Sequence, residues 1–374
     1  MSYHGRFEQA KQPKQPGKKK GLKIFLIVIA VILVLLLILA GAAYLYLQSK
    51  LKKMNIIELP KDTYAYTEPT DEVTRPPETG AAETTEATTE ATVPKMTADD
   101  IINILVVGQA ARAGEESYMA DSTMLVSINT YTKEINCMSV LRDSLVKLPD
   151  YKGHQCGKAK FTVCYNLGHM WGDTAGAMEM TNICLKDNFG VEVDYDVEVS
   201  FDSFIKMIDY IDGVDIELTQ AEADYLNKDT LYVKRTIEPG VQRLQGMEAL
   251  SYARMRKAAG DSESDIKRTE RQRKVVEALL ERFRYMSLSK LNNWVDILMP
   301  MVTTTMTPTD VTKLAAKILP LLPELKIKGY TIPMEGWGDM VDIYDNGEIH
   351  SVMRFDTAKE KKLIRAITEA EVSE

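Results

Sequence analysis

The sequence lacks several motifs that would assign it to a common enzyme class. It has no Gly-x-Ser-x-Gly nucleophile elbow, no Walker phosphate-binding loop and no His-Glu-x-x-His metal motif. These absences leave little support for hydrolase and nucleotide-binding functions. The net charge of −8 does not favour nucleic acid. The short basic tail at residues 1–23 contains no helix-turn-helix, so we expect no nucleic-acid partner.

Charge is missing altogether from residues 24–47. A helix of this length would reach about 36 Å, enough to cross a bilayer. The run is far longer than the apolar part of a cleaved signal peptide, although Ala40-Gly41-Ala42 resembles a cleavage site. Seven Lys and Arg residues precede the run and three follow closely. This bias predicts a single-pass protein of the cell membrane, with a cytoplasmic N-terminus and an extracytoplasmic main domain.

Residues 60–98 have almost nothing to bury, and the predicted linker extends over residues 48–98. This range contains the Thr- and Glu-rich segment DEVTRPPETGAAETTEATTEATVP. Such a composition predicts a disordered linker. It would serve either as a tether that holds a domain away from the membrane or as a simple spacer.

From Asp99 onward the pattern is that of a folded domain, which we predict to extend over residues 99–374. Strands are predicted at 101–108, 122–129, 134–142, 191–201 and 213–218, with possible edge strands at 329–333 and 347–355. Helices are predicted at 174–188, 203–211, 221–227, 246–256, 265–285, 288–302, 308–318 and 356–371. The expected fold class is α/β (mixed α+β), with a central mixed, partly antiparallel sheet flanked by helices on both faces (three-layer αβα).

One stretch of this domain, Tyr252 to Gln272, has an unusual charge pattern. It reads YARMRKAAGDSESDIKRTERQ and continues directly into a helix. On a helical wheel Asp265, Arg268 and Gln272 fall on the apolar face, where an unpaired charge is costly to bury. These side chains therefore form either a structural ion-pair network or a polar pocket for an anion. The additional arginines Arg254 and Arg256 favour the pocket.

The four cysteines follow the predicted membrane span. An even number of cysteines outside the cytoplasm permits disulfides, with Cys156 and Cys164 the favoured pair. Cys137 alternates with Ile135 on a predicted strand, so it is better explained as a buried free thiol. A zinc site built with His154 and His169 has little support, because the gap between the cysteines is too long for a zinc knuckle.

Several motifs together identify a family. Their order and spacing, after one N-terminal span, resemble the LytR-CpsA-Psr family of bacterial cell-envelope proteins. The motifs are Gly108 to Arg112, Ala120-Asp121-Ser122, Leu141-Arg142-Asp143, Tyr252 to Arg256 and Asp265 to Gln272.

The resemblance implies a phosphotransferase that moves a polyprenyl-diphosphate-linked glycopolymer, such as a teichoic acid or capsule, onto peptidoglycan. A diphosphate needs several cations, and the planar fork of arginine fits phosphate oxygens bidentately. The expected diphosphate-binding residues are Arg142, Arg254, Arg256, Arg268, Arg271 and Gln272. The expected catalytic residues are Arg142, Arg256, Asp265 and Arg268.

The metal half of the implied site is incomplete. The family picture includes Mg²⁺, and Asp121 is the metal ligand that carries over. The family usually has a second aspartate where this chain has Ala110, and an arginine where it has Met119. Asp143 and Glu115 are candidate replacements. The chain is therefore a working enzyme that depends weakly on metal, an impaired paralogue with a binding or attenuator-type regulatory role, or an engineered variant.

Overall fold

A computed structural model describes residues 49, 54–59, 96–109, 120–256, 258, 264–287, 290, 293, 297, 299–345 and 348–369. The chain divides into two compact units, Met1–Lys52 and Lys53–Glu374. Of the first unit only Ser49 is described, so the fold reported below is that of the second. The predicted tail and membrane span lie outside the described residues. No helix within the described ranges is both long and apolar enough to cross a membrane.

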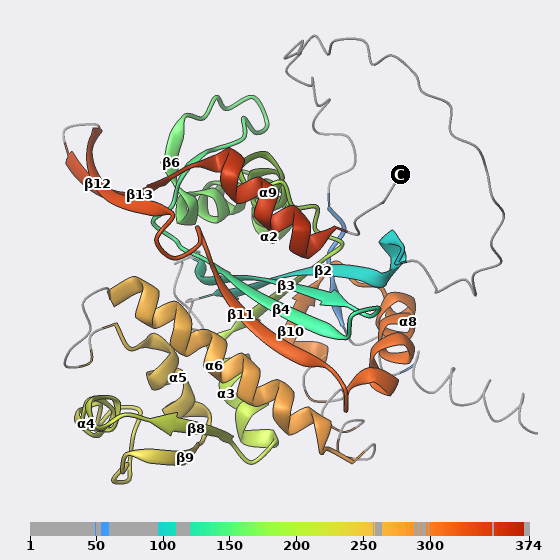
Figure 1. The fold of residues 1–374 in the computed structure, drawn as a ribbon, viewed down its shortest axis with the longest axis vertical. Coiled ribbons are helices and arrows are strands. Elements are labelled where there is room, and N and C mark those ends of the chain that lie inside the picture. Colours follow the sequence, from blue (N-terminus) through green and yellow to red (C-terminus); the bar gives the residue numbers. More distant parts are fainter. Residues whose placement is uncertain are drawn as a thin grey trace, which may run out of the picture. The chain divides into compact units, whose positions relative to one another are not determined.

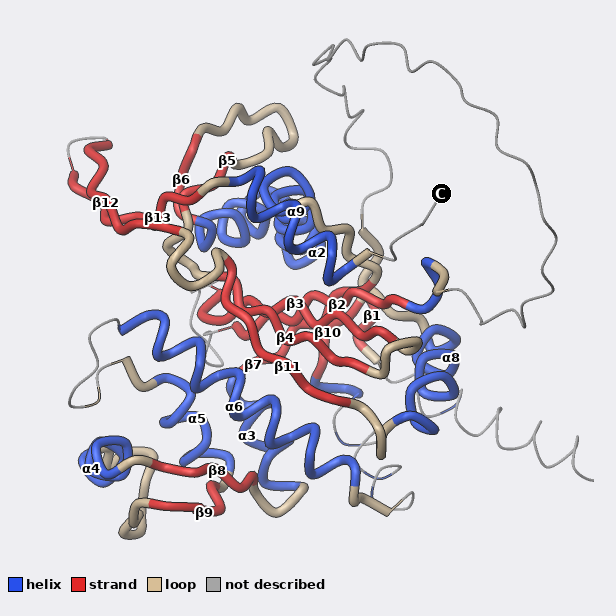
Figure 2. The backbone as a smooth tube through the Cα atoms, in the orientation of Figure 1, coloured by secondary structure: helices blue, strands red, loops and turns tan. Residues whose placement is uncertain are grey.

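A seven-stranded mixed sheet forms the centre of the second unit (Figures 1 and 2). Its order is β1-β10-β7-β2-β3-β4-β11. The strands are β1 (Asn55–Ile56), β2 (Ile101–Gln109), β3 (Ala120–Asn129), β4 (Glu134–Val140), β7 (Tyr195–Ser200), β10 (Val302–Thr304) and β11 (Lys326–Ile332). The pairs β2–β7, β4–β11 and β1–β10 are parallel, whereas β2–β3, β3–β4 and β7–β10 are antiparallel. The predicted mixed, partly antiparallel sheet is confirmed.

One face of the sheet is covered by α2 (Phe161–Phe189) and α9 (Thr357–Thr368) (Figure 1). Their apolar side chains share a core with Leu105, Leu125 and Met138 of the central strands. The prediction found only the second half of α2. The helix is interrupted at Gly172 and Asp173, where Asp173 adopts a φ of 57°. Because of this interruption, the helical spacing of apolar residues in the second half does not continue into the first half.

The other face of the sheet is covered by α6 (Ser264–Arg284) and α8 (Pro308–Ile318). Val276 and Leu280 of α6 pack beside Met124 and Cys137 in this second core. The helices on both faces confirm the predicted layered architecture. Cys137 is fully buried, as expected, and burial raises the pKa of its thiol to about 12. All four cysteines are free thiols, so the predicted Cys156–Cys164 disulfide is not formed.

A smaller subassembly packs against α6 on the side away from the sheet (Figure 1). It contains α3 (Phe201–Tyr210), β8 (Val214–Leu218), α4 (Gln220–Lys228), β9 (Gly240–Leu244) and α5 (Gly246–Arg254). β8 pairs with β9 in a separate two-stranded sheet. The sequence predicted β8 but not β9, because residues 240–244 carry neither strict alternation nor a long apolar run.

The remaining elements correct several predictions. Residues 55–56 fall in the predicted linker, yet they form β1 and pair with β10 at the sheet edge. Val302, predicted to end a helix, starts β10, and most of residues 288–298 lie outside the described ranges. The predicted edge strand 329–333 is confirmed as β11. The other candidate, 347–355, is instead β13 (Glu348–Phe355), which pairs with β12 (Gly338–Asp345) in a separate hairpin.

Five short elements complete the described part of the unit. β5 (Leu145–Lys147) and β6 (Lys158–Lys160) form a small antiparallel pair before α2. The 3-10 turns are η1 (Ala98–Asp100), η2 (Met299–Met301) and η3 (Leu319–Leu321).

The two halves of α2 approach closely at Gly168. A Cβ atom at this position would lie 2.5 Å from the carbonyl oxygen of Gly176 and 2.7 Å from Ala177 Cα. Both obstacles are backbone atoms, so neither can turn away. We expect Gly168→Ala to lower the free energy of unfolding by about 2 kcal/mol or more. Thermal or urea unfolding of the purified protein measures the loss.

Gly157→Ala is the matched control, because a Cβ there would meet nothing within 4 Å. This variant should stay within about 0.5 kcal/mol of the parent protein. Equal stability of the two variants would show that the halves of α2 do not pack as described.

Candidate active site

Three charged side chains from two distant parts of the chain meet beyond the carboxyl end of β4. Arg142 follows the strand, and Asp265 and Arg268 lie in the first turns of α6. Asp265 Oδ1 is 3.3 Å from Arg142 Nε and 2.7 Å from Arg268 Nη2. We call these three residues the charged cluster. All three were predicted site residues, and the structure brings them together.

The local sequence explains the position of this cluster. Residues three apart on a helix are neighbours, so Asp265 and Arg268 form an ion pair on one face. A carboxylate in the first turn also interacts favourably with the helix dipole. Arg268 is only 3% exposed, and a guanidinium at that depth requires a carboxylate partner. Asp265 Oδ2 is itself buried, and it accepts no hydrogen bond from the described residues.

Two further charges border the cluster. Lys160 Nζ lies 2.7 Å from Asp143 Oδ1, and Arg142 Nε lies 3.6 Å from Asp143 Oδ2. Among the described residues here, three cations face two carboxylates, which leaves one excess positive charge. Sequence analysis did not select Lys160, because it immediately precedes the unpredicted first half of α2. Its only sequence signal was proximity to the motif that contains Asp143.

The arginines at the end of α5 are exposed and lie outside this network. Arg254 stacks over the rings of Phe201 and Tyr232, at 5.1 and 5.8 Å from their centroids, and its Nη1 donates to the Tyr232 hydroxyl. Arg256 follows on the exposed side of buried Met255. Within the described ranges, no hydrogen bond or ion pair links Arg254 or Arg256 to the charged cluster. Their predicted contact with a diphosphate remains a prediction.

Arg271 occupies a different environment from Arg268. It is 4% exposed, its Nε lies 2.9 Å from Glu222 Oε1, and its Nη1 donates to the carbonyl of Met255. Burial raises the pKa of Glu222, but hydrogen bonds from Thr219 and Arg271 outweigh it, so the pKa is lowered overall. This buried pair joins α6 to α4. The environment of Arg271 is thus that of a structural residue, and Gln272, the next residue, is half-buried on the same helix.

For most positions of the predicted metal site, the residue or its side chain lies outside what the structure describes. Asp121 belongs to β3, but its side chain is not described, and Ala110, Glu115 and Met119 lie outside the described residues. The described part of the chain contains no group of three His, Cys, Asp or Glu side chains arranged to hold a metal ion. Asp143, a candidate replacement ligand, is already held by Lys160 and Arg142.

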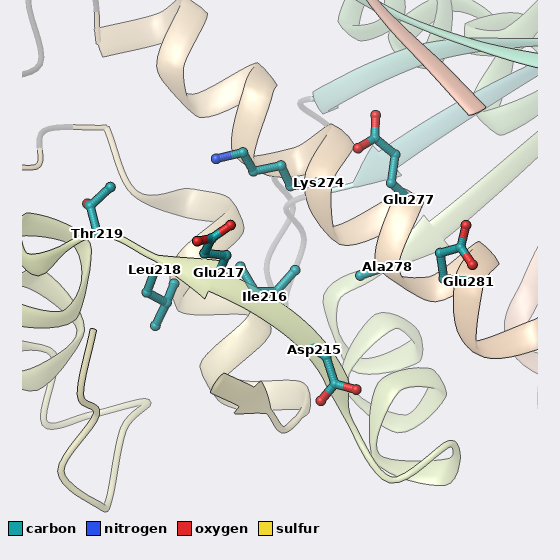
Figure 3. Close-up of a pocket in the computed structure, with 9 residues that line it drawn as sticks. All are labelled: Asp215, Ile216, Glu217, Leu218, Thr219, Lys274, Glu277, Ala278 and Glu281. Carbon is teal, nitrogen blue, oxygen red and sulfur yellow. The ribbon is translucent and has the colours of Figure 1, made fainter. Parts of the chain in front are cut away.

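Two depressions are lined in part by residues of α6. The first, of about 610 Å³, is an open hollow between β8 and α6 (Figure 3). It is lined by Asp215, Glu217, Glu277 and Glu281, with Lys274 as its one cation among the described lining residues. Asp215 is paired with Arg243 and Glu281 with Arg284, so these carboxylates are already occupied by neighbouring arginines. The second, of about 400 Å³, is lined by Leu141 and Ile266, the immediate neighbours of Arg142 and Asp265 in the chain.

Comparison with known proteins assigns the chain to a family. The LytR_cpsA_psr family profile matches residues 72–361, which is most of the chain. The chain therefore belongs to the LytR_cpsA_psr family, as the motifs predicted.

Two relatives of known name show the range within this family. The chain is 30% identical over 203 residues to the polyisoprenyl-teichoic acid–peptidoglycan teichoic acid transferase TagT of Bacillus subtilis (strain 168). This match covers 53% of the chain and 57% of TagT, so the chain spans little more than half of that relative's length. It is also 30% identical over 252 residues to the regulatory protein MsrR of Staphylococcus aureus (strain COL), covering 67% of the chain and 69% of MsrR.

Solved structures of TagT share the fold. TagT bound to LIIa-WTA superposes with a TM-score of 0.55 at 24% identity, over 72% of this chain and 92% of that one. The YwtF (TagT) structure with bound octaprenyl pyrophosphate lipid gives a TM-score of 0.52 at 20% identity, over 74% and 94%. At these identities the likeness establishes the mixed α/β fold with its helix-flanked central sheet.

Arg271 of α6 is buried and paired, whereas Arg256, just after α5, is exposed. This difference leads to a stability test. Arg271→Met leaves Glu222 buried without its guanidinium, and we expect a loss of about 3–5 kcal/mol in the free energy of unfolding. Arg256→Met removes the same charge from an exposed position and should change stability by no more than about 0.5 kcal/mol. Denaturant unfolding of both variants measures the difference.

The double variant Glu222→Gln/Arg271→Met should recover part of the loss, because the unpaired charge is then gone. If the Arg271→Met and Arg256→Met proteins were equally stable, the structural assignment of Arg271 would be wrong.

Proposed function

We propose that this protein is a phosphotransferase that attaches a polyprenyl-diphosphate-linked glycopolymer, of teichoic acid or capsule type, to peptidoglycan during cell-wall assembly. The observation that carries the proposal is the charged cluster. Two arginines from separate elements converge on one carboxylate beyond the end of a central strand. They do so in a chain whose family includes a named teichoic acid transferase.

The chemistry required by this reaction suits such a cluster. A hydroxyl oxygen of the acceptor sugar attacks the phosphorus that carries the glycopolymer. A new oxygen–phosphorus bond forms, the bond to the bridging oxygen of the diphosphate breaks, and polyprenyl phosphate leaves. Catalysis of this kind depends mainly on positioning and on neutralising negative charge. Arg142 and Arg268 supply the positive charge, and Asp265 holds both guanidinium groups in one orientation.

The remaining arginines extend the proposed diphosphate site. Arg254 is held by its aromatic neighbours with part of its guanidinium exposed. Arg256 is also exposed. Because both are accessible, each can donate to phosphate oxygens without breaking a buried ion pair. Arg271 would have to leave Glu222 to do the same, so its contribution is to hold α6 in place.

A Mg²⁺ ion is part of the proposal, held by Asp121 together with diphosphate oxygens and water. Mg²⁺ commonly takes one or two carboxylates plus substrate phosphates. When bound, the ion would neutralise charge on the diphosphate. With Ala110 in place of the second carboxylate, we expect binding to be weaker than in a site with two carboxylates.

The proposed location follows from the substrate. A lipid-linked donor is confined to the membrane, so an enzyme anchored by residues 24–47 and carrying an extracytoplasmic domain would reach it directly. The N-terminal tail at 1–23 would remain in the cytoplasm.

A second function is supported by two specific observations. The chain lacks a carboxylate at Ala110, and one of its relatives, MsrR, is named a regulatory protein. A catalytically impaired paralogue would bind the lipid-linked polymer through the same arginines and act as a regulatory membrane protein. Binding and turnover must therefore be measured separately.

The proposed activity can be tested with the full chain in detergent or nanodiscs. Supplied with a polyprenyl-diphosphate-linked glycan, a glycan acceptor and Mg²⁺, it should release polyprenyl phosphate and yield a phosphodiester-linked product. Arg268→Lys keeps the charge but loses the planar fork, and we expect it to lower the rate at least about 100-fold.

Lys267→Ala is the matched control, since Lys267 lies on the same helix and pairs with Glu270. It should retain nearly full activity. Donor binding without turnover would favour the regulatory alternative, whereas activity that survives Arg268→Lys would remove the charged cluster from the mechanism.

The absent second carboxylate gives a separate test. Restoring it with Ala110→Asp should raise the affinity for Mg²⁺, measured calorimetrically with a pyrophosphate ligand present. Ala111→Asp adds the same charge one residue further along the chain and should have a smaller effect. If Ala110→Asp leaves the affinity unchanged, position 110 does not face the metal.

A further inference from the structure

The second depression has no role in the donor chemistry described above. It lies beyond the carboxyl ends of β4 and β11, two adjacent parallel strands joined at this edge by a hydrogen bond from Leu141 N to the carbonyl of Ile332. In open α/β sheets, ligands commonly bind outside the carboxyl ends of parallel strands. We call this depression the edge cavity.

The edge cavity is lined in part by the chain neighbours of two residues of the charged cluster. Leu141 precedes Arg142, and Ile266 follows Asp265, so two of the lining residues are chain neighbours of cluster residues. The base of the β12–β13 hairpin forms another wall through Met353, whose N–H donates to the carbonyl of Asp143. A group bound in the cavity would therefore lie next to the proposed phosphoryl-transfer site.

The remaining wall is a loop that the fold holds in place. Fully buried Glu360 accepts a hydrogen bond from the backbone N–H of Met334 at 2.8 Å. Trp337 N donates to the carbonyl of Met334, and Lys359 Nζ lies 3.6 Å from the centre of the Trp337 ring. Gly336, at φ +76°, completes the turn. The loop is thus held by contacts within the protein itself.

The chemistry of the walls differs from that of the cluster. Methionine side chains, Met334, Met340 and Met353, provide apolar surface, and Glu335 and Asp339 provide two carboxylates. No lysine or arginine lines the cavity within the described ranges. Arg273, which does not line it, donates a hydrogen bond to the lining residue Thr331. A diphosphate would be repelled here. An uncharged ligand with hydroxyl donors and an apolar face would be complementary.

We propose that the edge cavity binds an uncharged acetamido-sugar residue of the acceptor glycan. This assignment rests on the proposed function, and it deepens it by naming where the acceptor lies. The carboxylates of Glu335 and Asp339 accept hydrogen bonds from sugar hydroxyls. The methionines contact the ring face and the acetamido methyl group. The volume of about 400 Å³ is within the range of small-molecule sites.

The test uses chitotetraose, an uncharged β-1,4-linked tetramer of N-acetylglucosamine, as the probe. Its binding to the full chain in detergent is measured by calorimetry and by saturation-transfer NMR. The double variant Glu335→Gln/Asp339→Asn removes both charges without changing side-chain size, and we expect it to weaken binding at least about tenfold. Met340→Ala, at a residue 53% exposed, should weaken binding by a smaller factor.

Asp342→Asn is the matched control. Asp342 is an exposed residue of the same strand that does not line the cavity, and its loss should leave binding unchanged. The proposal is overturned if the parent protein does not bind chitotetraose at millimolar concentration. It is also overturned if the double variant and Asp342→Asn bind chitotetraose equally well. A third contrary result would be that an amine-bearing stem peptide binds in the cavity and chitotetraose does not.

A second measurement separates this inference from the proposed function. In the transfer assay the double variant should raise the KM for the glycan acceptor at least about tenfold and leave the KM for the lipid-diphosphate donor unchanged. If the donor fails to bind even to the parent protein, the proposed function fails, while chitotetraose binding still reports on the edge cavity. If donor turnover is normal and the acceptor KM is unaffected, only the cavity assignment fails.

Discussion

A guanidinium group can lie beneath a protein surface only where a carboxylate or a carbonyl group meets it, and this requirement fixes the position of α6. Arg268 is held by Asp265 and Arg271 by Glu222, both within the first two turns or so of the helix. Further along, Arg273 donates to Thr331 of β11, and Arg282 donates to the carbonyl of Ile211. The helix is therefore tied to the central sheet on one side and to the α3–α5 subassembly on the other. Because of these ties, the N-terminal turn of α6 faces the end of β4, where Arg142 completes the charged cluster.

The regions around the N-terminal turn of α6 differ in their charge. The cluster carries an excess of positive charge, whereas the edge cavity beside it and the hollow between β8 and α6 carry carboxylates. A diphosphate is attracted to only one of these three regions. In a reaction that joins an anionic donor to a neutral sugar, the donor diphosphate would lie at the charged cluster and the sugar in the edge cavity. Their reacting atoms would then meet where the two regions adjoin. Under the proposed function, the two substrates would thus be separated by electrostatics as well as by shape.

The family relationship does not by itself decide between turnover and binding. A transferase and a regulatory protein are each 30% identical to this chain. The arginine side chains that would hold a diphosphate serve both functions equally, because they act by neutralising charge. What separates the two is the strength of the metal site, and there the substitution at Ala110 sets this chain apart from the expected pattern.

The sequence by itself determined the central elements and the site motif. Long apolar runs such as 101–108, and the helical period after Asp265, reflect local geometry that does not depend on the rest of the fold. The wheel placed Asp265 and Arg268 together because their spacing alone puts them on one face. It could not place Arg142 beside them, since more than one hundred residues separate the two segments and only the packing of α6 beneath β4 joins them. Nor could it distinguish Arg268 from Arg271, because the partner of Arg268 is Asp265 on the same helix, whereas the partner of Arg271 is Glu222, which lies far away in the sequence. The first half of α2, the strand β1 and the edge cavity were likewise decided by tertiary structure. Each depends on contacts with segments far along the chain, and such contacts leave no periodic pattern in the sequence.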